Sequence, residues 1–181
     1  MKVWTQIIKP TLVLIVVCAV ISAALALTYN LTGVANLGKG YSAEELKEFS
    51  ANALPEADTL TQITPSFEDE NLVLAYKAEN DAGMGIIVKG KGYNSEGITM
   101  MVGINPEGEV QGIHIISHLE TSGIGDKVAN NEAEYLKNFK GNTKDNVSAD
   151  IVAGATRTSN GIIDGVKKAT ELFEKLKTEV E

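Results

Sequence analysis

The hydrophobicity pattern begins with twenty residues, Pro10–Tyr29, that include no charged side chain. An α-helix rises about 1.5 Å per residue, so this run would span roughly 30 Å, the thickness of a bilayer's hydrocarbon core. A cleaved secretory signal is the competing interpretation, since Lys2 and Lys9 precede the run and Ala24-Leu25-Ala26 resembles a cleavage site. The run is longer than the apolar part of a typical signal. We therefore expect a retained transmembrane helix over about residues 10–29.

After residue 29 the pattern becomes that of a water-soluble domain. Residues 30–41 contain three glycines and predict a linker. Ser42 and Glu45 have the spacing of a capping box, which opens a helix that Pro55 ends. The sequence thus predicts an N-terminal segment over residues 1–29, the linker, and one domain over residues 42–181.

Short segments rich in valine, isoleucine and methionine form the middle of this domain. They predict β-strands at Leu72–Lys77, Gly85–Lys89, Ile98–Ile104 and Val110–Ser117. Because the turns between them are short, we expect an antiparallel sheet. A short helix is expected over Glu132–Phe139.

The C-terminal helix has the clearest pattern. Its apolar positions recur at alternating spacings of four and three, with lysines and glutamates between them, at Ile162, Val166, Ala169, Phe173, Leu176 and Val180. Together these elements predict an α+β fold in which the helices pack against one face of an antiparallel sheet.

Charge separates the two parts of the chain. Residues 1–29 carry two lysines and no acidic residue, whereas the rest has a formal charge of −10. So acidic a domain is a poor candidate for binding nucleic acid, because that affinity comes largely from neutralising phosphates, and we expect no nucleic-acid partner. Lys2 and Lys9 precede the apolar run and Lys39 is the first basic residue after it. The positive-inside rule therefore favours a cytoplasmic N-terminus and an extracytoplasmic domain in a single-pass protein of the cell membrane.

Side chains suited to metal binding or nucleophilic catalysis are scarce. The only cysteine, Cys18, lies in the apolar run, which excludes disulfides and cysteine-ligated zinc or iron–sulfur centres within the chain. The only histidines, His114 and His118, lie four apart at the end of a predicted strand. That spacing places them on one face about 13 Å apart, too far to ligate one metal ion. We therefore expect structural histidines and no metal site.

Two loops are more specific in sequence than a simple connection requires. Gly123 and Gly125 lie in the loop over residues 118–126 and allow a backbone path by which a flat ligand approaches closely. An ordinary strand-to-helix connection is the alternative for this loop alone.

The second loop leads directly into the C-terminal helix. Thr158 or Ser159 is the expected N-cap of that helix. The free amides and the helix dipole at this end favour an anion. Arg157, the only arginine, follows Thr156, and the small residues Ala153-Gly154-Ala155 clear the space in front of that hydroxyl.

These loops resemble motifs of the FMN-binding domain family. Asp150-x-x-Ala153-Gly154-Ala155-Thr156-x-Thr158-Ser159 resembles its flavinylation motif, and Glu120-Thr121-Ser122-Gly123-Ile124-Gly125 resembles its E-T-P-G-L-G loop. Gly90–Ile98 resembles its glycine–tyrosine strand and turn. One N-terminal span before one such domain is the layout of the G subunit of Rnf ion-translocating oxidoreductases. This chain departs from the motifs at Ser122, Ile124 and Ala153, where proline, leucine and a hydroxyl residue are usual.

The resemblance implies that FMN is joined through its phosphate to Thr156. A magnesium-dependent flavin transferase makes this phosphodiester from FAD and releases AMP. The remaining implied cofactor-binding residues are Glu120, Thr121, Gly123, Ile124, Gly154, Ala155, Arg157 and Thr158. Asp150 is assigned to recognition by the transferase, or else is a solvated loop acid. Gly161 and Gly165 are expected to leave room beside the helix.

The resemblance also implies a function within a larger assembly. The chain would be a membrane-anchored redox subunit that relays electrons among the other membrane and redox subunits of an Rnf-type complex, which couples ferredoxin:NAD oxidoreduction to ion translocation. It would not be a stand-alone enzyme. Two alternatives remain: the C subunit of a sodium-pumping NADH:quinone oxidoreductase, which is generally longer, and a membrane-anchored binding or assembly module whose flavin motif is vestigial.

Overall fold

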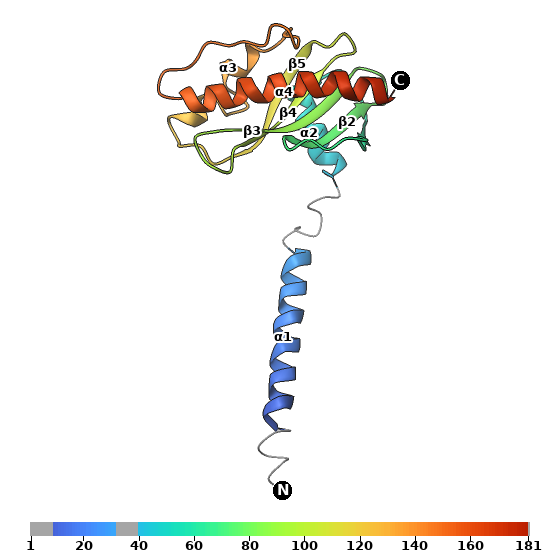
Figure 1. Cartoon of the computed structure of the whole chain (residues 1–181), viewed down its shortest axis with the longest axis vertical. Helices are drawn as coiled ribbons and strands as arrows, with labels where there is room; N and C mark the ends of the chain where they lie inside the picture. Colours follow the sequence, from blue (N-terminus) through green and yellow to red (C-terminus); the bar gives the residue numbers. More distant parts are fainter. Residues whose placement is uncertain (1–8, 32–39, 181) are drawn as a thin grey trace. The chain divides into compact units, whose positions relative to one another are not determined.

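The computed structural model describes residues 9–31 and 40–180, and the chain divides into two units, Met1–Tyr41 and Ser42–Glu181. The first unit contains the helix α1 (Lys9–Leu31), whose described side chains, at residues 11–25, are exposed (Figure 1). In the described part of the chain, no helix is both long and apolar enough to cross a membrane. Most of the predicted linker over residues 30–41 lies outside the described residues.

The second unit is built on a five-stranded antiparallel sheet whose strands lie side by side in sequence order. The strands are β1 (Leu60–Ile63), β2 (Leu72–Ala78), β3 (Met84–Gly90), β4 (Ile98–Ile104) and β5 (Val110–His118). The four predicted strands are confirmed with end shifts of at most one residue. β1 was not predicted, because it has only four residues and its two central side chains, Thr61 and Gln62, are polar and exposed.

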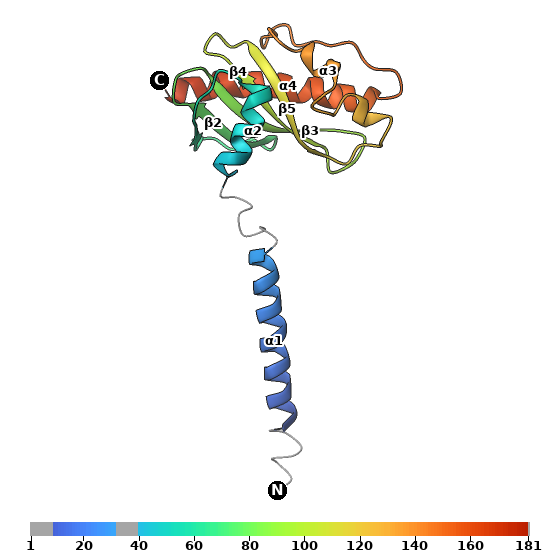
Figure 2. The same cartoon turned by 180° about the vertical axis from the view of Figure 1, so that it is seen from behind.

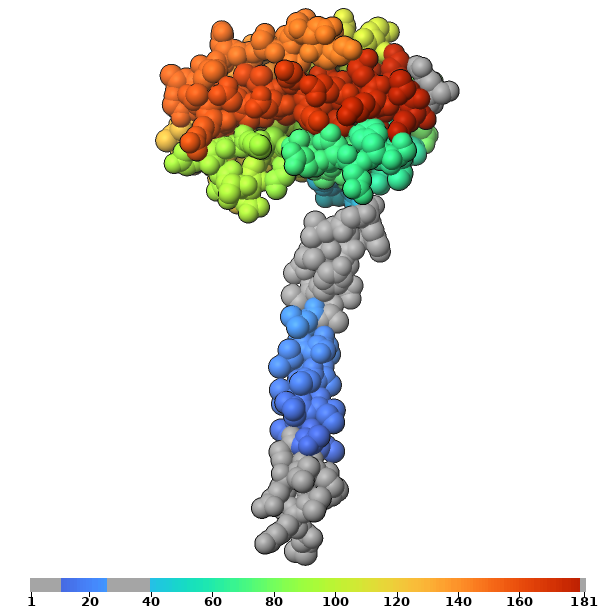
Figure 3. Space-filling model, viewed as in Figure 1, coloured from blue at the N-terminus to red at the C-terminus, as the bar shows by residue number. Residues whose placement is uncertain are grey.

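Helices cover both faces of this sheet, so the expectation that they share one face is wrong. α4 (Thr156–Val180) packs on β3 and β4, and α2 (Ala43–Ala53) packs on β4 and β5 from the opposite side (Figures 1 and 2). In the space-filling view the orange and red residues of α4 extend across the face that they cover (Figure 3). The predicted capping box of α2 is confirmed, with Ser42 and Glu45 bonding each other's backbone amides.

A row of glycines explains how α2 reaches the second face. Gly85, Gly103 and Gly112 are direct neighbours across β3, β4 and β5. A Cβ atom at Gly103 would collide with the Ala53 carbonyl, and one at Gly112 would collide with the Asn52 carbonyl. The missing side chains therefore let the end of α2 lie directly on the strand backbones.

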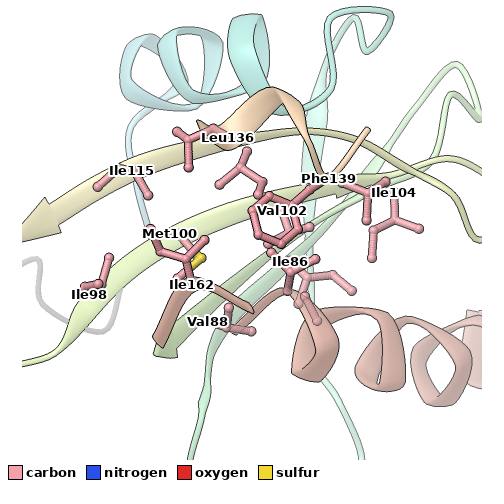
Figure 4. Packing of buried hydrophobic residues seen from close by; sticks show 14 of the residues in the cluster. Ile86, Val88, Ile98, Met100, Val102, Ile104, Ile115, Leu136, Phe139 and Ile162 are labelled. Carbon is pink, nitrogen blue, oxygen red and sulfur yellow. The ribbon is translucent and has the colours of Figure 1, made fainter. Parts of the chain in front are cut away.

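The main hydrophobic core lies between the sheet and α4. Ile162, Val166, Ala169, Phe173 and Leu176 are all buried, which confirms the predicted stripe as far as the side chains are described. Figure 4 shows Ile162 among the strand residues that it meets. Each of these side chains other than that of Ala169 stabilises the fold by roughly 1.5–3 kcal/mol when fully buried. The core thus fixes α4 against the sheet, and with it the loop that enters the helix.

The predicted helix over residues 132–139 is shorter in the structure. α3 spans only Glu134–Lys137, although Tyr135, Leu136 and the following Phe139 are buried as the pattern required. A 3₁₀ turn, η3 (Gly125–Lys127), precedes it. Apolar spacing therefore identified the buried positions here, but it overestimated the length of regular helix.

A bulge in β5 changes the expected placement of the histidines. Ile115 pairs with Met100 and Ser117 pairs with Thr99, so β5 contains one extra residue between His114 and His118. Since side chains alternate along a strand, one extra residue sends the two histidines to opposite faces rather than to one. Among the described residues, no group of three or more histidine, cysteine, aspartate or glutamate side chains is arranged to hold a metal ion.

The outer edge of β5 is paired with loop groups. The Asn131 side chain accepts a hydrogen bond from the Ile115 amide (2.6 Å) and donates one to the Ile115 carbonyl (3.0 Å). The Val110 amide donates to the Asn142 carbonyl, and the Val110 carbonyl accepts from the Gly141 amide, both at 2.8 Å. Loops thus satisfy the backbone of this edge strand at two places.

Candidate functional site

A cleft of about 380 Å³ lies at the N-terminal end of α4. Three segments form its walls: the loop after β3, the loop after β5, and the turn that enters α4. The lining residues are Tyr93, Glu120, Thr121, Ile124, Gly125, Gly154, Ala155, Thr156, Arg157 and Thr158. The volume lies within the range of small-molecule binding sites.

The structure brings eight of the nine predicted site residues to this cleft. Gly123 is the exception: it has a positive φ of 74° in the loop after β5, and a Cβ atom there would meet nothing within 4 Å. Asp150 does not line the cleft either. Tyr93 and Gly125 were not named as site residues. Tyr93 stands in the glycine–tyrosine turn and is 68% exposed, which is an unusual setting for an aromatic side chain.

The start of α4 differs from the predicted one. The helix begins at Thr156, and the Ser159 amide donates to the Ala155 carbonyl (2.8 Å), so Ala155 precedes the first turn. Thr158 and Ser159, the expected N-caps, lie inside that turn and are buried. Their hydroxyl groups serve other segments, since Ser159 accepts from the Val152 amide (3.3 Å) and Thr158 donates to Glu120.

This geometry presents Thr156 to the cleft. The Ala155 amide closes a turn onto the Val152 carbonyl (2.9 Å), and Gly154 has a left-handed φ of 85° that a side chain would strain. Thr156 follows this turn and is exposed, as is Arg157. The first amides of α4 have no carbonyl one turn earlier in the helix, so they are available to an anion.

Arg157 and Tyr93 line the cleft from two different walls and contact each other. The guanidinium carbon of Arg157 lies 5.8 Å from the centre of the Tyr93 ring, a cation–π separation. Ile124, half exposed, adds an apolar surface on the third wall. The cleft therefore combines a cation and free helix amides with apolar and aromatic surface.

Glu120 is buried and binds protein groups on every side. One carboxylate oxygen accepts from the amides of Tyr93 (3.0 Å) and Asn94 (3.2 Å), and the other accepts from the Thr158 hydroxyl. Its own amide donates to Nδ1 of His118 (3.2 Å). The carboxylate thus connects all three walls of the cleft.

Gly161 and Gly165 do not leave room beside α4, contrary to the expectation. A Cβ atom at Gly161 would collide with the Lys91 carbonyl, and one at Gly165 would lie 2.8 Å from the Met100 methyl group. The two glycines instead allow α4 to lie directly on β3, β4 and the loop that follows β3. Their smallness sets the distance between helix and sheet rather than a space for ligand.

Tyr135 forms a hydrogen bond with the first turn of α4. Its hydroxyl donates to the Ser159 carbonyl (3.3 Å). Burial raises the pKa of Tyr135, the Ser159 side chain opposes that rise in part, and the nearby charge of Asp150 adds to it. The phenol is therefore a neutral donor at physiological pH.

The comparisons with known proteins agree with this site. Residues 92–171, which include all three walls of the cleft, match the FMN-binding domain family. The part of the chain that forms the cleft therefore resembles an FMN-binding domain.

Relatives identify the particular family. The chain is 30% identical over 191 residues to the G subunit of the ion-translocating oxidoreductase complex of Vibrio cholerae, a match that covers 92% of this chain and 90% of the relative. The corresponding G subunit of Methanosarcina acetivorans is 29% identical over 92% of this chain and 94% of its own length. That of Shewanella oneidensis is 30% identical over 74% and 70%. The chain belongs to the family of G subunits of ion-translocating oxidoreductase complexes.

Proposed function

We propose that this chain is an electron-transfer subunit of an ion-translocating oxidoreductase complex and carries FMN bound covalently to Thr156. The observation that supports it best is the placement of an exposed threonine at the first residue of α4, inside a cleft. Membership of the G-subunit family supports a role as a subunit of such a complex.

The residues of the cleft suit the chemistry of FMN. The helix amides and Arg157 would hold a phosphate, which both prefer as a partner. Exposed Gly154 and the small, buried Ala155 place no large side chain beside Thr156, and the exposed Tyr93 and Ile124 offer apolar surface to a flat ring. When bound, FMN supplies the redox chemistry, and the protein sets its position and surroundings.

The attachment would use the Thr156 hydroxyl as the nucleophile. Its oxygen loses a proton and forms a bond to the phosphorus of the FMN part of FAD, while the bond from that phosphorus to AMP breaks. A flavin transferase with magnesium would carry out this step, and Asp150, beside but outside the cleft, would contribute to its recognition. Arg157 and the helix N-terminus would then stabilise the phosphodiester anion.

The N-terminal segment completes the proposal. Its apolar sequence over residues 10–29 supports a single-pass anchor, with the N-terminus in the cytoplasm and the FMN-binding domain outside. The anchor and the covalent bond would keep the flavin at a high effective concentration near the other membrane and redox subunits. In such a complex, electron flow from ferredoxin to NAD would be coupled to ion translocation.

Covalent attachment is tested by in-gel fluorescence. The full chain is co-expressed with a flavin transferase, denatured and separated on a gel. We expect a fluorescent band from the wild type and from Thr178→Ala, which alters an exposed threonine near the other end of α4. Thr156→Ala should lack the band while keeping the wild-type melting temperature, because the side chain is exposed. A labelled Thr156→Ala protein would place the attachment elsewhere.

A further inference from the structure

We propose that Glu120 and Thr158 are positioning residues for flavin attachment: their hydrogen bond holds the turn that carries Thr156 against the other two walls of the cleft. This inference rests on the proposed function of Thr156. It assigns Glu120 to the protein's own groups rather than to contact with the cofactor.

The first support is the set of donors around the Glu120 carboxylate. The side chain is only 8% exposed, and a buried carboxylate is costly unless hydrogen bonds compensate it. Two amides from the loop after β3 and the hydroxyl of Thr158 supply those bonds. Charged acceptors form stronger hydrogen bonds than neutral ones, so the carboxylate firmly holds both the loop after β3 and the Thr158 side chain.

The second support is independent of hydrogen bonding. Gly92 and Gly125, from two different walls, both face the Glu120 side chain. A Cβ atom at Gly92 would collide with the carboxylate, and one at Gly125 would lie 2.8 Å from Glu120 and 3.0 Å from the Thr158 hydroxyl. The absence of side chains at both positions thus creates the space that the Glu120–Thr158 pair occupies.

The pair acts on Thr156 through the geometry of a helix. Residues two apart in an α-helix point about 200° apart, which is nearly opposite. Thr158 is 2% exposed and points inward to Glu120, whereas Thr156 is exposed. Fixing Thr158 inward therefore fixes the rotation of the first turn and directs Thr156 into the cleft.

The test measures flavin transfer to the purified full chain in detergent, with transferase, FAD and magnesium. Initial rates at several chain concentrations give kcat/KM for the chain as acceptor. Thr158→Val removes the hydroxyl and keeps the shape, and Thr158→Ser keeps the hydroxyl. Thr170→Val is the matched control, because Thr170 is also buried on α4 but donates to the Lys167 carbonyl (2.8 Å) within the helix.

We expect Thr158→Val to lower kcat/KM by about tenfold or more, because small misplacements of a reacting group have effects of this order. Thr158→Ser should restore the wild-type value, and Thr170→Val should retain it. Melting temperatures of the flavin-free proteins separate loss of positioning from loss of fold. Equal kcat/KM values for Thr158→Val and Thr170→Val would overturn the inference.

Glu120→Gln provides a second test that does not depend on the valine variant's folding. The amide keeps the size of the side chain, but its nitrogen replaces the oxygen that accepts from the Thr158 hydroxyl, so the charge-assisted bond is lost and at most a weaker, neutral bond replaces it. We expect the same loss of kcat/KM. Adding Thr158→Val should cause little further loss, because both substitutions act on the same Glu120–Thr158 hydrogen bond. Additive losses would overturn the pairing, and an unlabelled wild type would overturn both the inference and the proposed function.

Discussion

At the scale of the residue, His114 is a buried histidine held between two amides. The side-chain nitrogen of Asn52 lies 3.0 Å from Nδ1 of His114, and that of Asn131 lies 3.5 Å from Nε2. The Phe49 ring packs against the imidazole with 4.9 Å between ring centres. Burial lowers the pKa of His114 below the ordinary 6.5, and the charge of Glu48 opposes the effect in part. The folded protein therefore prefers a neutral imidazole.

This shift predicts how stability depends on pH. Below about pH 6.5 the histidine of the unfolded chain takes up a proton before that of the folded chain does, so the free energy of unfolding decreases as the pH falls. We expect urea unfolding to show a larger loss of stability between pH 7 and pH 5 in the wild type than in His114→Gln. Equal losses of stability between pH 7 and pH 5 in both proteins would show that His114 contributes nothing to the acid sensitivity.

At this scale, sequence reasoning identified the residues of the cleft more reliably than it identified the contacts that they make. Glu120 and Thr158 were both assigned to the cofactor, and both reach the cleft, but their side chains bind each other. A hydroxyl near a helix start is normally expected to cap its own helix. The Thr158 hydroxyl instead bonds to Glu120, 38 residues earlier in the chain. A contact over that distance leaves no pattern in the local sequence.

At the scale of the element, the close contact between α4 and the loop after β3 is the feature that places the cleft. Gly161→Ala would push a methyl group into the Lys91 carbonyl. We expect a loss of about 1–3 kcal/mol in the free energy of unfolding, the usual cost of overpacking a tight contact. Asn160→Ala, at the exposed neighbouring position, is the control. Chemical denaturation measures both, and an unchanged Gly161→Ala stability would contradict this account.

Periodicity predicted most elements but not their arrangement. The strands and α4 follow from apolar runs and stripes, which are local features of sequence. The seating of α2 on the second face depends on Gly103 and Gly112 becoming neighbours, and only the register of the sheet brings them together. The bulge that separates His114 from His118 is likewise a property of strand pairing.

At the scale of the whole molecule, the proposed orientation has a direct test. A protease added outside intact cells, or to spheroplasts where an outer membrane is present, should degrade the domain over residues 42–181. The reason is that the lysines of the N-terminal segment favour retention of that end in the cytoplasm. An antibody against a tag on the C-terminus follows the loss, and a cytoplasmic protein serves as the control. Full protection of the domain would reverse the orientation.

The paired edge of β5 limits how this domain joins an assembly. Many proteins associate by lending a strand to an open sheet, since unsatisfied amides and carbonyls recruit one readily. At Val110 and Ile115 those groups are already occupied, by Gly141, Asn142 and the Asn131 amide. A neighbouring protein that approached this side would have to break those bonds before it gained any of its own. At these two residues recognition must come from side-chain surfaces, whose contacts can form and separate without remodelling the sheet.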